Sequence, residues 1–291
     1  MMKLIADSSS DRPAIAGAEV QYVPLVVSTD HVHFVDDETL DVRQMLDTLS
    51  AHRGRSYTAC PSVDGWLTAF DGGDEIYAVT ITSALSGSYN AAMAARELYL
   101  QEHPGAKVAV FDSLSTGPEL RLILEKLQEL TAQGLPFEQV EAQTREYMHH
   151  TRLLFSLQSL HNMAQNGRVS KVAAAAVGVL GIRIVGTASA EGTLQQLNKC
   201  RGDRKALPEL LDESYRFVPG AVLTLREGED VALVATGSTV HEVVEAAQQL
   251  ADLGIQAKVV SVPSIRPCDT AALLAALRPC GSVITVEEHN V

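Results

Sequence analysis

The stretch IYAVTITSALSGS, residues 76–88, decides the fold. Its first half, residues 76–81, is an apolar run of the kind expected for a central parallel strand that is buried on both faces. Its second half is a serine-glycine-serine turn, after which we predict an alanine-rich helix over residues 87–98. A buried strand that runs through a short turn into a helix is the building unit of a parallel α/β sheet.

The same alternation of strand and helix continues on both sides of this stretch. The patterns predict strands at residues 2–6, 20–27 and 108–111, and helices at residues 41–50 and 119–133, with a further helix beginning at Pro136. Apolar residues at helical spacing support the helices, and Gly134 is typical of a helix C-terminus. The first part of the chain is therefore predicted to be an α/β domain with a mainly parallel sheet.

The pattern changes from about residue 179. Two short predicted strands, 182–187 and 193–199, flank the turn Ala190-Glu191-Gly192, which indicates a hairpin and so a partial second domain with an antiparallel sheet. A helix at 205–214 and a linker at 217–220 follow. Predicted strands at 231–236, 257–262 and 282–286 then alternate with helices at 239–253 and 270–277. We interpret residues 216–291 as a separate βαβαβ module with helices on both faces of a parallel sheet.

Composition excludes several classes of protein. The 291 residues carry a formal charge of −13, which argues against a general nucleic-acid binder, because such proteins need a basic face. No apolar run approaches the roughly 20 residues that span a bilayer, so we expect no transmembrane segment. The N-terminus shows no secretory signal, and the four cysteines form no CxxC pair. We therefore expect a cytoplasmic protein without a structural metal site.

Polar clusters stand where predicted strands end, at the edge of a parallel sheet where ligands gather. They are residues 7–11, 58–62, 82–88 and 112–113. The cluster at 82–88 places hydroxyls and the N-terminus of a helix together, which suits a carboxylate or a phosphate. Ser86 or Ser88 could equally be a simple helix cap, since serine is preferred there.

Other residues leave alternatives open. Arg168 lies in a glycine turn, where it could neutralise an anion or be an ordinary surface cation. His31 and His33 alternate along an extended segment, but no third metal ligand accompanies them. The turn at Ser86 is not the GxSxG motif of hydrolases, and neither GxGxxG after a strand nor GxxxxGK[ST] occurs, so no catalytic residue and no cofactor is predicted.

Residues 1 to about 207 resemble the DegV family of bacterial fatty-acid-binding proteins. The resemblance rests on ordered motifs, which are DSSSD at 7–11, YVPL at 22–25, FVDDETLD at 34–41, TACPS at 58–62, ITSALSGSYNAA at 81–92, FDSLSTG at 111–117, NGRVS at 166–170 and KCRGDRKAL at 199–207. The family reads TSQPS where this chain reads TACPS, so the middle of that loop is altered.

The resemblance implies a lipid carrier that is not an enzyme. Such a protein buries one long-chain fatty acid and presents its carboxylate to a fatty-acid kinase, which is the catalytic partner. On this chain the carboxylate would be held by Thr58, Ser62, Ser86, Gly87 and Ser88, with Arg168 nearby. The alanine- and valine-rich run at 172–180 could line the acyl tunnel or be core helix.

The C-terminal part departs from that family. Residues from about 216 to 291, through LREGEDVALVATGSTVHEVVEAAQQLADLGIQAKVVSVPSIRPCDTAALL and VITVEEHNV, resemble the C-terminal domain of transketolases, which does not bind the cofactor. The second DegV-like domain would then be incomplete from about residue 179. This resemblance implies two alternatives to a carrier: a part of a split transketolase-like enzyme whose partner is a thiamine-enzyme subunit, or a hybrid chain without joint function.

Overall fold

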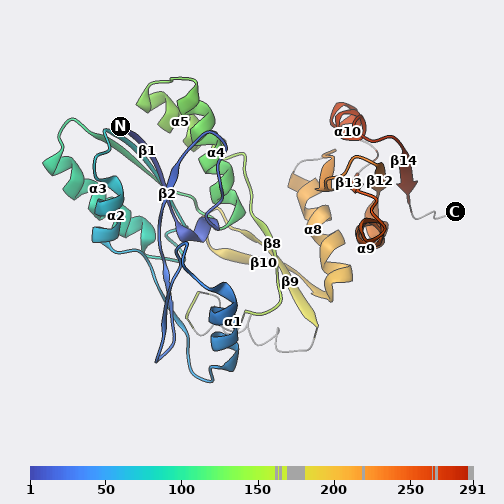
Figure 1. Cartoon of the computed structure of the whole chain (residues 1–291), viewed down its shortest axis with the longest axis horizontal. Coiled ribbons are helices and arrows are strands. Elements are labelled where there is room, and N and C mark those ends of the chain that lie inside the picture. The colour runs from blue at the N-terminus through green and yellow to red at the C-terminus, as the bar shows by residue number, and fades with distance from the viewer. Residues whose placement is uncertain are drawn as a thin grey trace. The chain divides into compact units, whose positions relative to one another are not determined.

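A computed structural model of the chain describes residues 1–160, 163, 166–168, 181–217, 220–263, 265 and 268–287 (Figure 1). The chain forms two compact units. The first contains residues 1–153 and 160–175 together with the hairpin turn at 187–195, and the second contains residues 154–159, 176–186 and 196–291. Each unit is described by itself.

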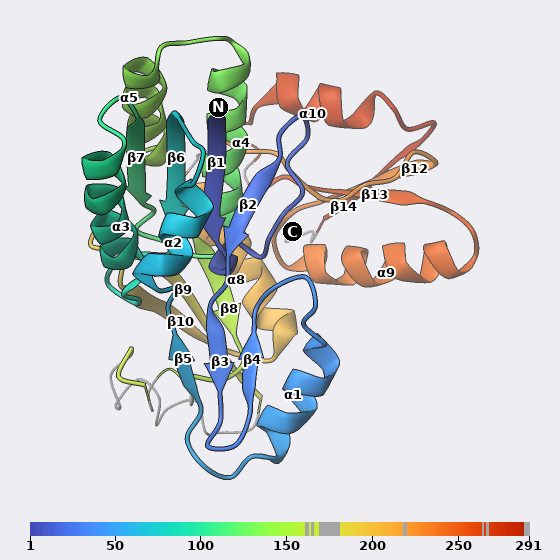
Figure 2. The ribbon, with the colours of Figure 1, turned by 60° about the vertical axis from the view of Figure 1, so that its left-hand side comes forward.

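A parallel sheet in the order β2-β1-β6-β7 is the centre of the first unit. Figure 2 shows its strands side by side. The predicted central strand is therefore confirmed, because β6 lies between two parallel neighbours. The strands are β1 (Met2–Asp7), β2 (Val20–Val23), β6 (Glu75–Thr80) and β7 (Lys107–Asp112), and the helices of this unit are α1 (Val42–Ala51), α2 (Val63–Phe70), α3 (Ser88–Glu102), α4 (Pro118–Ala132) and α5 (Phe137–Met148).

Alternate residues of these strands point into two different cores, as the pleat of a sheet requires. In β6, Tyr77 and Val79 pack with side chains of α4 and α5, whereas Ile76 and Ala78 pack with side chains of α2 and α3. The chain's single tryptophan, Trp66, is fully buried in the second of these cores. Helices cover both faces, and this is why the strands read as continuous apolar runs.

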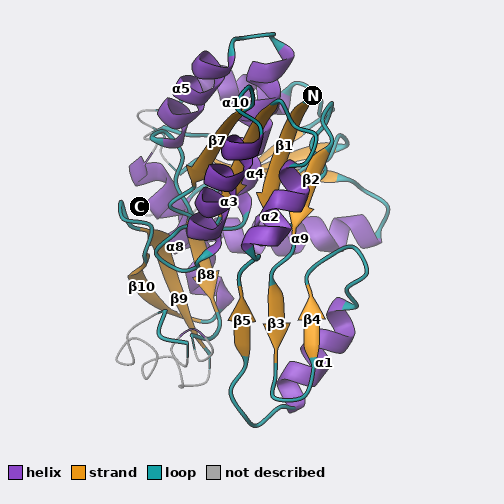
Figure 3. Ribbon diagram, turned by 90° about the vertical axis from the view of Figure 1, so that its left-hand side faces the viewer, coloured by secondary structure: helices purple, strands orange, loops and turns teal. Residues whose placement is uncertain are grey.

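The predicted strand at 20–27 is confirmed for residues 20–23 and wrong in its extent, because a strand of a different sheet occupies its second half. The break falls at Pro24, which has no N–H group for a sheet ladder, and the Leu25 N–H donates instead to the Ser8 hydroxyl (3.0 Å). β3 (Val26–Ser28) then begins a small antiparallel sheet in the order β4-β3-β5, with β4 (His33–Val35) and β5 (Tyr57–Ala59), seen beside α1 in Figure 3.

The predicted hairpin is confirmed. β9 (Ile182–Ala188) and β10 (Leu194–Arg201) are neighbours in a three-stranded sheet of order β10-β9-β8, where β8 is Leu154–Leu157. Two backbone hydrogen bonds close the turn between β9 and β10: the Ser189 N–H donates to the Thr193 carbonyl (2.8 Å), and the Gly192 N–H donates to the Ser189 carbonyl (2.9 Å). So short a connection joins only antiparallel neighbours, since a parallel pair needs a long crossover.

The predicted βαβαβ layer is also present. β12 (Val231–Ala235) pairs in parallel with β13 (Ala257–Ser261) and with β14 (Val283–Val286), and α9 (Val240–Asp252) and α10 (Thr270–Leu277) lie between them in the chain. Within the described residues these strands do not pair with β9, so the layer is a sheet of its own. An additional edge strand, β11 (Leu223–Arg226), was not predicted, and it pairs antiparallel with β13.

The core of this layer extends to a helix that precedes it in the chain. Leu211 of α8 (Asp203–Phe217) is buried against Leu233 of β12 and Val243 of α9, while the other face of the sheet packs on α10. The Arg204 guanidinium also donates to Glu242 of α9 (2.6 Å). The predicted domain limits, an end at residue 207 and a start at residue 216, stay a prediction. One hydrophobic cluster nevertheless contains residues from both sides of these limits, including Leu207 and Leu233.

We expect Leu127→Ala to lower the free energy of unfolding of the first unit by about 2–5 kcal/mol, because it leaves a cavity in the α4 core. Leu127 is 0% exposed, whereas Leu122 on the same helix is 41% exposed, so Leu122→Ala is the matched control and should stay within about 0.5 kcal/mol of wild type. Urea unfolding followed by Trp66 fluorescence measures both. Equal losses in the two variants would contradict the assigned core.

Candidate anion-binding site at the carboxyl edge of the parallel sheet

The carboxyl ends of β1, β6 and β7 are joined by a network of backbone hydrogen bonds. The Ser113 N–H donates to the carbonyl of Thr80 (3.2 Å), and the Thr82 N–H donates to the carbonyl of Ser115 (2.9 Å). The Gly117 N–H donates to the carbonyl of Ser9 (2.9 Å) in the turn after β1. Three of the four predicted polar clusters therefore lie together at this edge.

Asp7, the last residue of β1, is the centre of this edge. Its side chain is fully buried, and both carboxylate oxygens accept hydrogen bonds. One oxygen accepts from the N–H and hydroxyl of Ser9. The other accepts from the Ile81 N–H (2.9 Å) and from the Ser88 hydroxyl (2.6 Å). A buried carboxylate needs such donors, so Asp7 holds the turn after β6 and the start of α3 against the end of β1.

Burial raises the pKa of the Asp7 carboxyl above its ordinary value of 3.8. The hydrogen bonds donated by Ser88, Ser9 and the Ile81 N–H lower the pKa, but burial has the larger effect because it disfavours the charged form. No charged side chain forms an ion pair with Asp7 among the described residues. The site therefore contains a buried acid that can exchange a proton.

The serine-glycine-serine turn assigns different roles to its two hydroxyls. Gly87 is the N-cap of α3 and supplies no side-chain cap, while the Ser86 hydroxyl accepts weakly from the Ser88 N–H (3.4 Å). The hydroxyl of Ser88 is buried and donates to Asp7. Ser88 therefore does not cap α3 with its side chain, and Ser86 caps it only at long distance. The N-terminus of α3 keeps backbone N–H groups that can receive an anion.

The loop that contains Thr58 and Ser62 approaches this turn, although not from the predicted position. Thr58 lies within β5, opposite Val27 in the antiparallel sheet, and so it does not follow a parallel strand. That part of the prediction is wrong because Pro24 sends the chain into the second sheet. Ser62 is the N-cap of α2, and its hydroxyl accepts from the Gly65 N–H (3.1 Å). Both side chains are exposed.

Two contacts bring the loops together. Cys60 Sγ lies 3.1 Å from the point that a Cβ atom on Gly87 would occupy, so a side chain at Gly87 would meet the thiol. The Arg168 guanidinium donates from Nε to the carbonyl of Leu85 (2.9 Å). The 58–62 loop and Arg168 therefore each lie against the 85–88 turn. That the hydroxyls of Thr58 and Ser62 reach one ligand with Ser86 stays a prediction.

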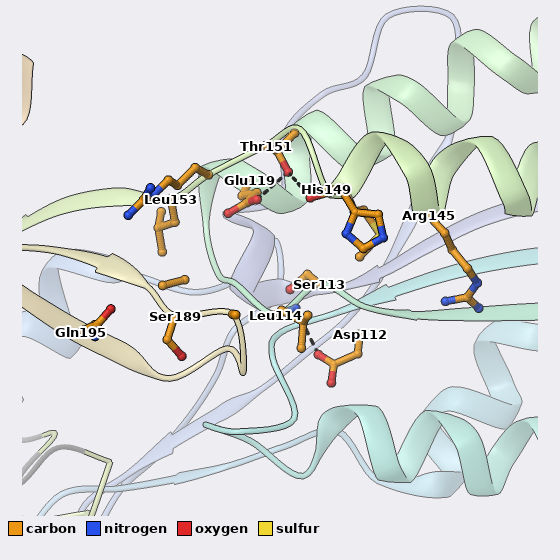
Figure 4. A pocket seen from close by; sticks show the side chains of 14 residues that line it. Asp112, Ser113, Leu114, Glu119, Arg145, His149, Thr151, Leu153, Ser189 and Gln195 are labelled. Carbon is orange, nitrogen blue, oxygen red and sulfur yellow. Dashed lines mark hydrogen bonds between the residues drawn. The ribbon is translucent and has the colours of Figure 1, made fainter. Parts of the chain in front are cut away.

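The last predicted cluster in the chain, Asp112-Ser113, also lines a pocket of about 700 Å³ in the same unit (Figure 4). Sequence reasoning missed two of its charged side chains. Glu119 is buried and accepts from the Thr151 hydroxyl, and Arg145 pairs with Glu141 (2.7 Å). The position of Glu119 in the first turn of a predicted helix was a usable signal, because carboxylates are favoured there.

The structure tests only some of the predictions made for other residues. Residues 172–180, named as a tunnel lining, lie outside the described residues, as do the last two residues of the NGRVS motif, 169 and 170. His33 Nδ1 shares a hydrogen bond with the Ser28 hydroxyl (2.8 Å). Across the part of the chain that the structure describes, no three His, Cys, Asp or Glu side chains gather as metal ligands, and no helix is long and apolar enough to cross a bilayer.

A parallel α/β unit with backbone N–H groups at a helix N-terminus, serine hydroxyls and an arginine at its carboxyl edge has the features of a protein that binds an organic anion. Comparison with known proteins shows the family to which the chain belongs. A family model described as "Uncharacterised protein, DegV family" matches residues 1–267, and the chain belongs to the DegV family. The match extends beyond residue 207, where the sequence analysis placed the end of the DegV resemblance, and it includes β11, β12 and β13.

Relatives and solved structures agree with this assignment. A DegV domain-containing protein of Streptococcus pneumoniae is 46% identical over 216 residues, which are 72% of this chain and 76% of the relative. A solved DegV family protein from Eubacterium eligens, loaded with heptadecanoic acid, is 43% identical with a TM-score of 0.74, covering 99% of this chain and 92% of that one. The fatty acid kinase B3 protein of S. pneumoniae, loaded with linoleic acid, is 36% identical with a TM-score of 0.74, covering 90% and 92%.

We expect the stabilising contribution of Asp7 to decrease as pH rises. Its pKa is higher in the folded than in the unfolded state, so the folded state binds more protons between pH 3.8 and the folded-state pKa. Unfolding free energies of wild type and Asp7→Asn are measured by urea at several pH values. Their difference, wild type minus variant, should fall by at most about 1.4 kcal/mol per pH unit in this window. A difference that rises with pH would contradict the direction of the shift.

Proposed function

We propose that this chain is a lipid carrier that binds one long-chain fatty acid and presents its carboxylate to a fatty-acid kinase. The observation that carries the proposal is the N-terminus of α3, where the cap residue Gly87 makes no side-chain hydrogen bond, in a chain related to proteins whose structures hold heptadecanoic and linoleic acid. Helix N-termini favour carboxylates through their free N–H groups and the helix dipole. The chain itself is then a binding protein of the cytoplasm, and the kinase is the enzyme.

The ligand carboxylate would lie at the start of α3. In this proposal Ser86 and the backbone N–H groups after Gly87 donate to it directly. Arg168 supplies positive charge beside Leu85, and the hydroxyls of Thr58 and Ser62 close the site from the neighbouring loop. Ser88 belongs to the same set, but its hydroxyl donates to Asp7, so its contact with the ligand depends on that residue. No cofactor is needed, because the ligand is the cargo.

The acyl chain would supply most of the binding energy. A C16 chain has about 15 CH₂ or CH₃ groups, and at roughly 0.8 kcal/mol each its burial is worth on the order of 12 kcal/mol before the costs of binding. The carboxylate contacts then set the position of the reactive end of the ligand. A carrier of this kind holds its cargo by the tail and exposes the head to the partner enzyme.

Native mass spectrometry of protein purified from a bacterial host tests the proposal. We expect an adduct of fatty-acid mass, and a clean apo mass under gentle conditions would count heavily against it. Ser86→Ala should weaken binding by about 1–3 kcal/mol through the loss of a charge-assisted hydrogen bond. Ser83→Ala is the matched control, because Ser83 is exposed in the same loop. Calorimetric affinities that are equal for the two variants would refute the role of Ser86.

The parallel layer of β12, β13 and β14 supports a second proposal of narrower scope. Residues 216–291, which resemble the transketolase C-terminal domain, would serve a split enzyme by pairing with a thiamine-enzyme subunit. An affinity pull-down separates the two proposals, since a carrier should recover a kinase and a split enzyme should recover a thiamine enzyme. A chain that retains no lipid and recovers neither partner would be a hybrid without joint function.

A further inference from the structure

We propose that Asp7 is a positioning residue that couples fatty-acid binding to the uptake of one proton, by controlling which way the Ser88 hydroxyl donates. The inference rests on the proposed function, because it concerns the same carboxylate site. It adds a residue that does not touch the ligand and a pH dependence that simple anion binding at a helix N-terminus would not have.

The first step is the state seen in the structure. Ser88 has a single hydroxyl proton, and it donates that proton to Oδ2 of Asp7 over 2.6 Å. A serine cannot donate the same proton to a ligand. While Asp7 is ionised, Ser88 therefore offers a fatty-acid carboxylate only lone pairs, which repel it. Ser86 does not have this restriction, since its hydroxyl accepts from the Ser88 N–H and keeps its own proton for another acceptor.

The second step is the neutral state, which the same geometry also satisfies. A proton from solvent on Oδ2 of Asp7 would be donated to Ser88 Oγ, so this hydrogen bond reverses its direction. The Ile81 N–H and both donors of Ser9 keep their carboxyl acceptors. The Ser88 proton is then released to donate to the ligand carboxylate. One proton enters from solvent and forms an O–H bond on Oδ2 of Asp7, all other changes are in hydrogen bonds, and the ligand remains an anion.

The third step is electrostatic. Two carboxylates in one buried region disfavour each other, so a bound fatty-acid anion raises the proton affinity of Asp7 beyond what burial already causes. Among the described residues no charged side chain pairs with Asp7, and Arg168, the cation proposed for the ligand, donates to the Leu85 carbonyl and not to Asp7. The titratable and charged groups on the elements around Asp7 are Asp11, Arg12, Asp36, Cys60, Tyr89, Asp112, Glu119 and Arg168, and none of them hydrogen-bonds to Asp7 or contributes to the shift of its pKa.

Titration calorimetry of the delipidated full chain with dodecanoate, below its micellar concentration, tests the inference. Each titration is run at one pH in two buffers of different ionisation enthalpy, which reveals the number of protons taken up. We expect wild type to take up a measurable fraction of one proton per bound dodecanoate in the pH range where Asp7 titrates, which lies above its ordinary pKa of 3.8. Its affinity should fall by up to tenfold per pH unit as pH rises. Asp7→Asn should bind with no such uptake, because its amide does not titrate.

Variants of Ser88 and Ser86 test the same inference if Asp7→Asn fails to fold. Ser88→Thr retains a hydroxyl and should retain the proton uptake. Ser88→Ala cannot transmit the change to the ligand, so its affinity should depend less on pH than that of wild type. Ser86→Ala should weaken binding by a similar factor at every pH and leave the uptake unchanged.

The outcomes separate this inference from the proposed function. Dodecanoate binding without proton uptake in wild type, or with equal uptake in wild type and Asp7→Asn, overturns the role of Asp7 and leaves the carrier intact. A pH profile of Ser88→Ala that matches wild type also overturns it. No binding of dodecanoate or of a longer acid at any pH overturns the proposed function itself.

Discussion

The buried carboxylate of Asp7 joins the end of β1 to a stretch that lies 74 to 81 positions further along the chain. It must be satisfied by donors, because an unpaired charge in the interior is costly. Ser9, Ile81 and Ser88 supply these donors, so the turn after β6 and the first residue of α3 are held at the end of β1. The direction in which the N-terminus of α3 faces, and with it the candidate anion site, depends on this one group.

The rest of the site is arranged around that turn. Gly87 has no side chain where Cys60 packs, which lets the 58–62 loop come close, and the Arg168 guanidinium is held on the Leu85 carbonyl. Nothing in this arrangement requires the protein to perform chemistry. Its N–H groups, hydroxyls and arginine would suit an anion, which agrees with the proposed carrier whose cargo is activated by another protein.

Much of the fold follows from local patterns, and the exceptions have identifiable causes. The strand at 76–81, the hairpin at 182–199 and the C-terminal parallel layer were predictable because burial on one or two faces leaves a periodic signal. The stretch at 20–27 misled the prediction because Pro24 divides two strands that look continuous. The contact of Leu211 with the C-terminal layer was not predictable, since α8 carries no signal of which core it will join.

The sequence by itself determined where strands and helices form and that polar clusters follow the parallel strands, because these are properties of short windows of residues. It could not distinguish Ser86 from Ser88, since both precede or begin the same helix. Only the tertiary structure decided that Ser88 donates to Asp7, a residue 81 positions away, while Ser86 faces no such acceptor among the described contacts. A hydroxyl donates to whichever acceptor the fold brings within hydrogen-bonding distance, and that is a long-range property.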